Sequence, residues 1–214
     1  AGYLGTVENG QTFGTLRGDR GVGTFGGSED HTAILAAQRG RISQYRYCPV
    51  QFERSIRMPS GYVFAIATSG VVAEKTGSAM DRYNAASGRA SALVDLWHKH
   101  VGRAEPHLAA IVASSPDAPM KLLQALQTAS TGDFTRDDLA ARLEHFLTEN
   151  ERVVPKAGDA MEQADLLEFG RLVDQSQQAA EELLGNQIPQ TAALARAARK
   201  CGAAAASAFG AGFG

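Results

Sequence analysis

The spacing of apolar residues divides the chain into a first part with strand-like alternation and a longer second part with helical periodicity. Apolar and polar residues alternate over 42–47 and 50–56, on either side of Cys48 and Pro49, which predicts two half-buried strands joined by a turn. A continuous apolar run of strand length, Tyr62-Val-Phe-Ala-Ile-Ala-Thr68, predicts a strand that is buried on both faces at the centre of a sheet.

Helical periodicity dominates the chain after Gly70. One helix, ending near Gly102, is predicted from apolar residues that fall four, three and four positions apart, which are Ala86, Ala90, Leu93 and Trp97. Thr135 and Asp138 form a capping-box pattern at the start of another helix. Pro106 begins a short apolar segment. Further helices are predicted, in chain order, over 120–129, from the capping box to Met161 with an interruption near Pro155, from Leu166 to Gly185, and from Pro189 to Lys200. Their apolar faces are expected to form the core.

The first 27 residues are rich in glycine, threonine and charge, and they are expected to form loops around short strands or at most one helical turn. A glycine-rich loop, Gly21-Val-Gly-Thr-Phe-Gly-Gly-Ser-Glu-Asp-His31, follows with two adjacent carboxylates and an imidazole. Asp30 precedes the apolar run 32–37, so we expect its carboxylate in the first turn of a helix, where the macrodipole stabilises negative charge. Glycine lets a backbone approach a ligand closely, which makes the loop a candidate site. A helix cap on a flexible loop explains the same residues.

A second glycine cluster ends the chain, with glycines at the alternate positions Gly210, Gly212 and Gly214. Such glycines let backbone N–H groups come close to an anion, or to another loop that holds one. A tight turn or a flexible tail is the alternative interpretation.

Composition narrows the class of protein. The chain has 214 residues, 44% of them hydrophobic and 21% charged, so it can bury a substantial core. A net charge of -2 argues against nucleic acid as the main partner, because nucleic-acid-binding surfaces are normally basic. No apolar run approaches about 18 residues, so neither a membrane span nor a membrane partner is predicted. Cys48 and Cys201 lie far apart without a neighbouring ligand set, which indicates neither a disulfide framework nor a metal site and favours the cytoplasm.

Several common catalytic motifs are not supported. Gly21, Gly23 and Gly26 satisfy G-x-G-x-x-G, but no buried strand precedes them, as a dinucleotide-binding fold requires. The chain contains no G-x-x-x-x-G-K-[ST], no G-x-S-x-G and no H-E-x-x-H. P-loop, α/β-hydrolase and zincin chemistry therefore lack their signatures.

Four stretches together carry a resemblance to a known family. They are Gly26-Gly-Ser-Glu-Asp-His31, the exit of the apolar run at Thr68-Ser-Gly-Val71, the pair Tyr83-Asn84, and the terminal Gly210-Ala-Gly-Phe-Gly214. In order and rough spacing they resemble galactokinase and its relatives in the GHMP small-molecule kinase superfamily. Galactokinases typically have Gly-x-Met-Asp-Gln where this chain has Gly27-Ser28-Glu29-Asp30-His31. The resemblance covers nearly the whole chain.

The resemblance implies an α+β fold with two domains. Residues 1–60 would complete the N-terminal kinase domain and carry the catalytic-aspartate loop, and residues 61–214 would form a helix-rich C-terminal domain on an antiparallel sheet, truncated after the third glycine motif. The first two superfamily motifs, which supply an arginine, most sugar-binding acids and the Ser-rich loop that cradles ATP phosphates, are not in the sequence. We therefore expect a fragment of a longer kinase that is inactive by itself.

The resemblance also implies a reaction, the ATP- and Mg²⁺-dependent phosphorylation of a sugar hydroxyl, the anomeric C1 hydroxyl of galactose or a related sugar. The family's catalytic aspartate falls on Asp30, which either accepts the proton of that hydroxyl or orients it. Substrate contacts would fall on Gly27, His31 and Tyr83, and support of the phosphate-binding loop on Gly210, Gly212 and Gly214.

Two other functions stay open. His31 and Glu29 replace the usual Gln and Met, which leaves the sugar undetermined and allows a GHMP kinase that acts on another small alcohol. The chain is also compatible with a non-enzymatic sugar-sensing or interaction module derived from such a kinase.

Overall fold

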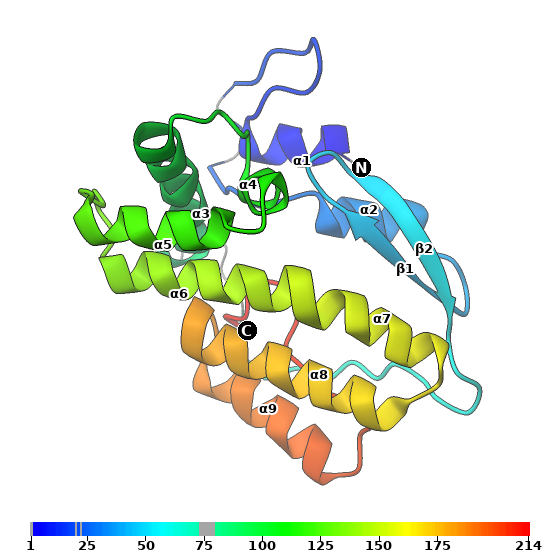
Figure 1. Ribbon diagram of the computed structural model, residues 1–214. Coiled ribbons are helices and arrows are strands. Elements are labelled where there is room, and N and C mark those ends of the chain that lie inside the picture. Colours follow the sequence, from blue (N-terminus) through cyan, green and yellow to red (C-terminus); the bar gives the residue numbers. More distant parts are fainter. Residues whose placement is uncertain (1, 20, 22, 73–79) are drawn as a thin grey trace.

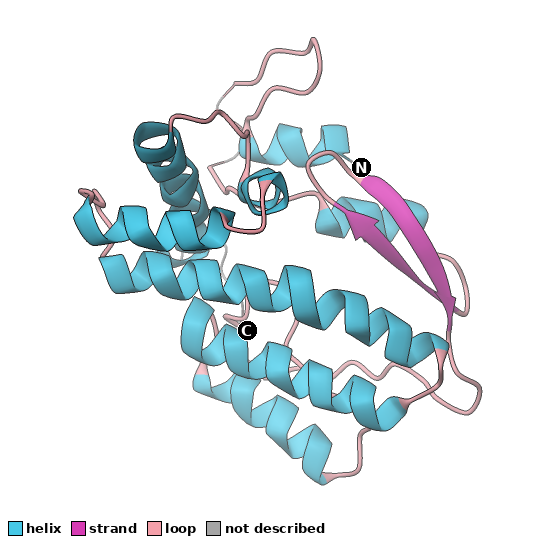
Figure 2. Ribbon diagram, viewed as in Figure 1, coloured by secondary structure: helices cyan, strands magenta, loops and turns pink. Residues whose placement is uncertain are grey.

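A computed structural model describes residues 2–19, 21, 23–72 and 80–214 of the chain (Figure 1). Helices make up most of these residues, and the strands among them form one two-stranded antiparallel sheet (Figure 2). The predicted α+β class is therefore confirmed.

The first part of the chain consists of two short helices and a β-hairpin: α1 (Gly2–Asn9), α2 (Glu29–Ala36), β1 (Arg41–Arg46) and β2 (Gln51–Arg57). The hairpin confirms the two strands predicted from the alternating pattern, with Arg41 opposite Arg57. Helix α1 corrects the expectation of loops with at most one helical turn. It lies against the start of α2 at Gly5, where an added Cβ would come within 2.7 Å of Ser28 Cβ, so this contact requires glycine.

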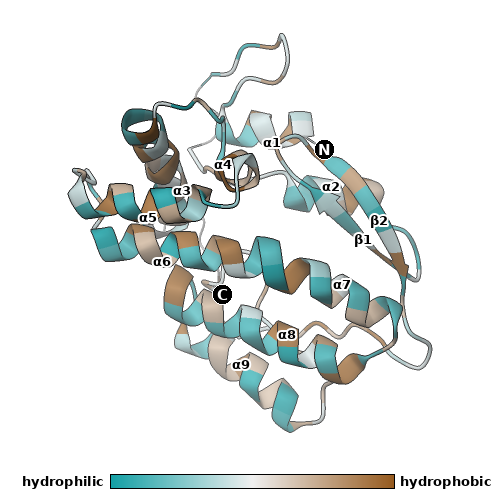
Figure 3. Ribbon diagram, in the orientation of Figure 1, coloured by the Kyte–Doolittle hydropathy of each residue, from teal (hydrophilic) through white to brown (hydrophobic). Residues whose placement is uncertain are grey.

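Four helices form the larger core: α3 (Met80–Val101), α4 (Leu108–Ser114), α5 (Ala118–Thr128) and α6 (Arg136–Leu147). Figure 3 shows their hydrophobic residues in bands that alternate with hydrophilic ones. The predicted periodicity is confirmed, because Leu93 and Trp97 of α3 are completely buried in this core. The predicted capping box is also present. Thr135 Oγ1 accepts a hydrogen bond from the Asp138 N–H at 3.0 Å, and Asp138 Oδ2 accepts one from the Thr135 N–H at 3.1 Å.

The chain from Thr148 to Lys200 is mostly helical, as predicted. It contains the π-helical segment η2 (Thr148–Val153), α7 (Val154–Glu162), α8 (Leu166–Ala179), the π-helical segment η3 (Ala180–Leu184) and α9 (Pro189–Lys200). The interruption predicted near Pro155 is η2, which joins α6 to α7 into one long rod (Figure 1). Pro155 lies in the first turn of α7. Gly185, with φ 68°, ends η3 at the predicted position.

The hairpin is attached to the rod through Arg54 of β2. Its Nη1 donates to Asp159 Oδ1 at 2.6 Å, and its Nη2 donates to the Pro155 carbonyl at 2.8 Å. In Figure 1 the hairpin, α1 and α2 lie on one side of the α6–α7 rod and α8 and α9 on the other. The N-terminal unit is thereby held against the helical part.

The segment 62–68 corrects the sequence interpretation. It was expected to be the central strand of a sheet, but it forms no strand and pairs with no other segment among the described residues. Its Val63 and Ile66 side chains are 86% and 83% exposed. A strand is stabilised by ladder hydrogen bonds to a neighbour, and the described part of the chain places none beside this segment. Within the described part of the chain, the antiparallel sheet is thus the hairpin of residues 41–57.

Candidate functional site

A cavity of about 220 Å³ lies where α1, α2, α3 and the end of the chain meet. Its lining comes from five separate parts of the sequence and comprises Glu8, Phe25, Gly26, Gly27, Glu29, Asp30, Tyr83, Ala86, Ser87, Asn186, Gly210, Ala211 and Phe213. Four of the residues singled out in the sequence therefore share one cavity, which are Gly27, Asp30, Tyr83 and Gly210.

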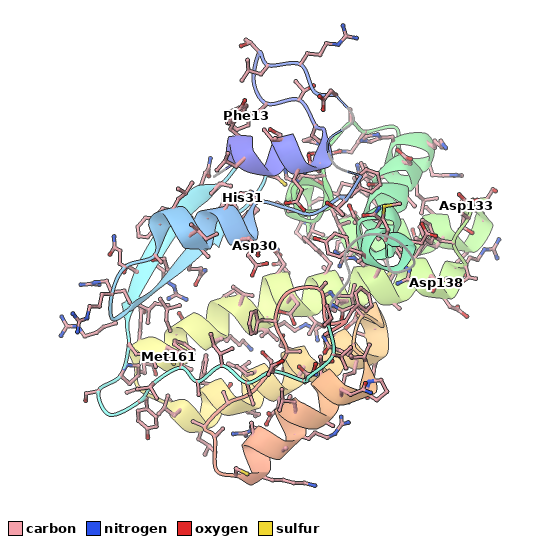
Figure 4. The ribbon with its side chains drawn as sticks, turned by 180° about the vertical axis from the view of Figure 1, so that it is seen from behind. Phe13, Asp30, His31, Asp133, Asp138 and Met161 are labelled. Carbon is pink, nitrogen blue, oxygen red and sulfur yellow. The ribbon has the colours of Figure 1, made fainter. Side chains whose placement is uncertain are left out.

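Asp30 is the second residue of α2, so its carboxylate belongs to the first helical turn as predicted. The helix macrodipole stabilises negative charge at this position. Ser28 precedes the helix without a side-chain capping bond, and its carbonyl accepts a hydrogen bond of 2.6 Å from Thr32 Oγ1. Figure 4 shows Asp30 on the side of α2 that faces the helical part of the molecule. The carboxylate is thus presented to the cavity from a fixed helix end.

Helix α1 holds the glycine-rich loop from one side. Asn9 Nδ2 donates to the Gly26 carbonyl at 2.9 Å, and Thr24 Oγ1, which is buried, donates to Glu8 Oε1 at 3.0 Å. These bonds place the loop along the cavity wall. Glu8 is thereby held by a loop residue and also lines the cavity.

Gly26 lies between two polar side chains of that wall. An added Cβ would come within 2.8 Å of the Tyr83 hydroxyl and 2.9 Å of Glu8 Oε1, so glycine is what allows the loop to pass between them. At Gly27 an added Cβ would meet nothing within 4 Å. Gly26 therefore shapes the wall, while Gly27 faces open space beside the cavity.

The terminal glycine loop reaches the cavity through Gly210, whereas Gly212 attaches the loop to the neighbouring helix. Gly212 is buried, and its carbonyl accepts hydrogen bonds from the Ile188 N–H and from Thr191 Oγ1, both at 3.2 Å. A side chain at Gly212 would collide with the Asn186 carbonyl. Gly212 therefore fastens the loop to the start of α9, whereas Gly214 is exposed.

His31 does not line the cavity. It lies on the side of α2 toward α1 (Figure 4), and its Nδ1 is buried without a hydrogen-bond partner among the described residues. Tyr47, from the turn of the hairpin, lies near the same helix end. Burial raises the pKa of Tyr47, and the negative charges of Glu29 and Asp30 add to the rise.

The charged lining of the cavity is acidic, with Glu8, Glu29 and Asp30 and no lysine or arginine among the described residues. Arg142 contacts its wall from behind, and Arg89 lies further along α3. Arg142 Nε donates to the carbonyl of Ala86, a lining residue, at 3.2 Å, and Arg89 is paired with Asp138 at 3.4 Å. The cavity therefore suits a neutral polar ligand better than a free anion.

A resident metal is not indicated by the described residues, which contain no group of three or more His, Cys, Asp and Glu that could hold an ion. Mg²⁺ does not need such a group, because it is commonly held by one or two carboxylates together with water and phosphate oxygens. One or two of the lining carboxylates would suffice for such an ion, whereas a zinc or calcium cage needs more protein ligands than they provide.

The polar lining residues Glu8, Ser87 and Asn186 were not singled out in the sequence. Glu8 belongs to a helix that the sequence pattern did not predict. Asn186 follows the stop at Gly185, and Phe213 was noticed only as part of a glycine cluster. The one sequence signal for Glu8 was its acidic side chain ahead of the glycine-rich loop.

No family model matches the chain, and no curated protein matches it significantly. Within the described residues, no helix combines the length and the apolar character needed to cross a membrane.

Proposed function

We propose that the protein containing this chain is a galactokinase-like sugar kinase of the GHMP superfamily. It transfers the γ-phosphoryl group of ATP to a sugar hydroxyl, the anomeric C1 hydroxyl of galactose or a related sugar, with Mg²⁺. The observation that supports this proposal is the shared cavity. Gly27, Asp30, Tyr83 and Gly210 were selected from motifs up to 183 positions apart, and they line the same small space.

The size and charge of the cavity agree with a sugar as its occupant. Pockets for drug-sized ligands span roughly 300–1,000 Å³, whereas this one has about 220 Å³. It therefore suits one small molecule, and the nucleotide is expected to lie outside it. Carboxylates and a phenol hydroxyl are suitable partners for the hydroxyl groups of a neutral sugar.

Phosphoryl transfer requires mainly positioning and charge stabilisation, so few side chains have to act. Asp30 faces the sugar hydroxyl and accepts or orients its proton. The Tyr83 hydroxyl and the backbone at Gly27 bind the sugar beside it. Glu8 and Glu29 would be the further carboxylates available to hold Mg²⁺, which would neutralise charge on the phosphates.

The proposal also covers the fold and the location of the protein. Residues 1–60 belong to the N-terminal kinase domain and residues 61–214 to the C-terminal one, in a cytoplasmic enzyme. The chain by itself is inactive, because it contains no Ser-rich loop for the ATP phosphates.

The experiment is to incubate the complete protein with ATP, Mg²⁺ and a panel of sugars and other small alcohols, and to measure ADP release. ADP release with galactose or a related sugar is the expected result. Release only with a mevalonate-like alcohol contradicts the sugar assignment and indicates a GHMP kinase with another substrate. Sugar binding without any ADP release contradicts the kinase and indicates a sugar-sensing module.

A further inference from the structure

Asn84, the residue after Tyr83 on α3, uses both atoms of its side-chain amide on the glycine-rich loop. Its Nδ2 donates to the Gly23 carbonyl at 2.9 Å, and its Oδ1 accepts from the Phe25 N–H at 2.9 Å. The side chain thus pairs with alternate residues of the loop in the way that a neighbouring strand would. One side chain fixes a backbone segment that is 59 to 61 positions away in the sequence.

The same loop is held from its other side by α1, through Asn9 and the Gly26 carbonyl. Residues 23–26 are therefore clamped between two helices, with Asn84 as the contact from α3. Glycine at positions 23 and 26 gives this segment a flexible backbone, so side-chain hydrogen bonds are needed to define its conformation.

The two segments that Asn84 joins, α3 and the glycine-rich loop, both carry residues that line the cavity. On α3 the next residue toward the N-terminus is Tyr83, and on the loop the chain runs from Phe25 through Gly27 to Asp30. A displacement of the loop relative to α3 changes the distance across the cavity between the Tyr83 hydroxyl and the Asp30 carboxylate. The two hydrogen bonds of Asn84 are a direct link that opposes this displacement.

We propose that Asn84 is a positioning residue, which sets the spacing of Tyr83 and Asp30 for the sugar by clamping the glycine-rich loop to α3. The proposal rests on the proposed sugar kinase function. Asn84 itself does not line the cavity, so it acts through the loop and not by contact with the sugar.

The experiment compares the complete wild-type protein with Asn84→Ala and Asn84→Asp. Asn84→Ala removes both bonds, whereas Asn84→Asp keeps the acceptor for the Phe25 N–H and loses the donor to Gly23. Asn150→Ala is the control, since Asn150 is exposed and, among the described residues, its amide bonds only to the neighbouring Glu151. Two properties are measured: hydrogen exchange of the Phe25 amide, and steady-state kinetics with separate KM values for the sugar and for ATP.

In Asn84→Ala we expect the Phe25 amide to exchange at least about 10-fold faster, and kcat/KM for the sugar to fall about 10- to 100-fold with KM for ATP unchanged. Asn84→Asp keeps the Phe25 amide protected and still loses sugar kcat/KM, because the Gly23 anchor is gone. A side chain that served only folding would lower the melting temperature without changing KM for the sugar.

Unchanged exchange at Phe25 in Asn84→Ala overturns the clamp. Faster exchange with unchanged sugar kinetics overturns the positioning role. A wild-type protein that phosphorylates no alcohol overturns the proposed kinase, and the role of Asn84 in it, whereas the exchange measurement still decides whether the clamp exists. The two failures are therefore distinguishable.

Discussion

The Tyr83 hydroxyl lies 2.8 Å from the position that a methyl group on Gly26 would occupy, so α3 and the glycine-rich loop meet with no room for a side chain between them. The second atom near that position is Glu8 Oε1, at 2.9 Å. Three elements of the cavity wall are thus in contact at one glycine. The next residue, Gly27, has no such neighbour, and the two glycines form a natural pair for comparison.

Gly26→Ala is expected to change the cavity wall at a small cost in stability. The two crowded atoms are the ends of side chains, which can rotate away, so the free energy of unfolding should fall by only about 1 kcal/mol. Tyr83 leaves its place, and the affinity for the sugar falls. Gly27→Ala in the free protein should leave Tyr83 and the stability unchanged. Urea unfolding measures the stability, and calorimetry measures the affinity for the sugar. If Gly26→Ala matched wild type in both, this description of the cavity wall would be contradicted.

Asp30→Asn in the complete protein is expected to lower kcat by about 10²- to 10⁴-fold, because a carboxamide cannot accept the hydroxyl proton. KM for ATP should change little, since the proposed role of the carboxylate is at the sugar hydroxyl. Asp137→Asn is a matched control, for Asp137 is also an acidic residue in the first turn of a helix, is exposed, and lies outside the cavity. Steady-state ADP release measures both variants. A near-wild-type kcat for Asp30→Asn would rule out Asp30 as the catalytic aspartate.

Most of the helical part could be predicted because its signals are local. The spacing of Leu93 and Trp97, the capping box at Thr135 and the stop at Gly185 each depend on residues within a few turns of one another, and the structure contains all of them. Helix α1 was not predicted, because its glycines weaken the local helix signal. The contact that requires one of them, Gly5 against Ser28, is visible only in the folded chain.

The prediction of a strand over 62–68 was wrong although its local signal was strong. An apolar run of this length typically indicates a buried strand. A strand also needs a neighbouring strand to pair with, and the composition of the segment does not show whether one is present. At the cavity the resemblance drew attention to Asp30, Tyr83 and Gly210, whereas Glu8 enters through the unpredicted helix. His31 is placed away from the cavity lining, which no spacing rule could have indicated.

His145 is expected to make the protein less stable in mild acid. Burial, together with the positive charge of Arg142, lowers the pKa of His145 to about 4. The unfolded chain takes up a proton at this histidine below about pH 6.5 while the folded protein remains neutral there, so stability falls as the pH drops from about 6.5 to 4. Screening by solvent at this partly exposed imidazole keeps the effect below the roughly 3 kcal/mol that a shift of this size would otherwise give.

His145→Asn removes this contribution, so its free energy of unfolding should fall less than that of wild type between pH 7 and pH 4.5. Urea unfolding at the two pH values measures the difference, and the comparison of variants cancels the carboxylates that titrate in the same range. His100→Asn, an exposed histidine at the end of α3, serves as the control and should behave as wild type does. An equal fall for wild type and His145→Asn would contradict the assignment.

The segment 62–68 is expected to make the chain self-associate. It has no charged residue and no proline, its apolar side chains are exposed, and no backbone ladder satisfies it among the described residues. The double substitution Val63→Lys and Ile66→Lys should therefore lower light scattering in concentrated solution, because charges oppose strand pairing. Helix content and melting temperature should not change, as the two side chains are 86% and 83% exposed.

Ile34→Lys distinguishes strand pairing from nonspecific association of exposed apolar side chains. Ile34 is 80% exposed, but it lies on α2, where the backbone is already hydrogen-bonded within the helix. If association proceeds through the unpaired segment, Ile34→Lys leaves the scattering as high as in wild type while the double variant lowers it. An equal decrease in both variants would show that apolar exposure alone is responsible, and a wild-type chain that stays monomeric at high concentration would rule out self-association altogether.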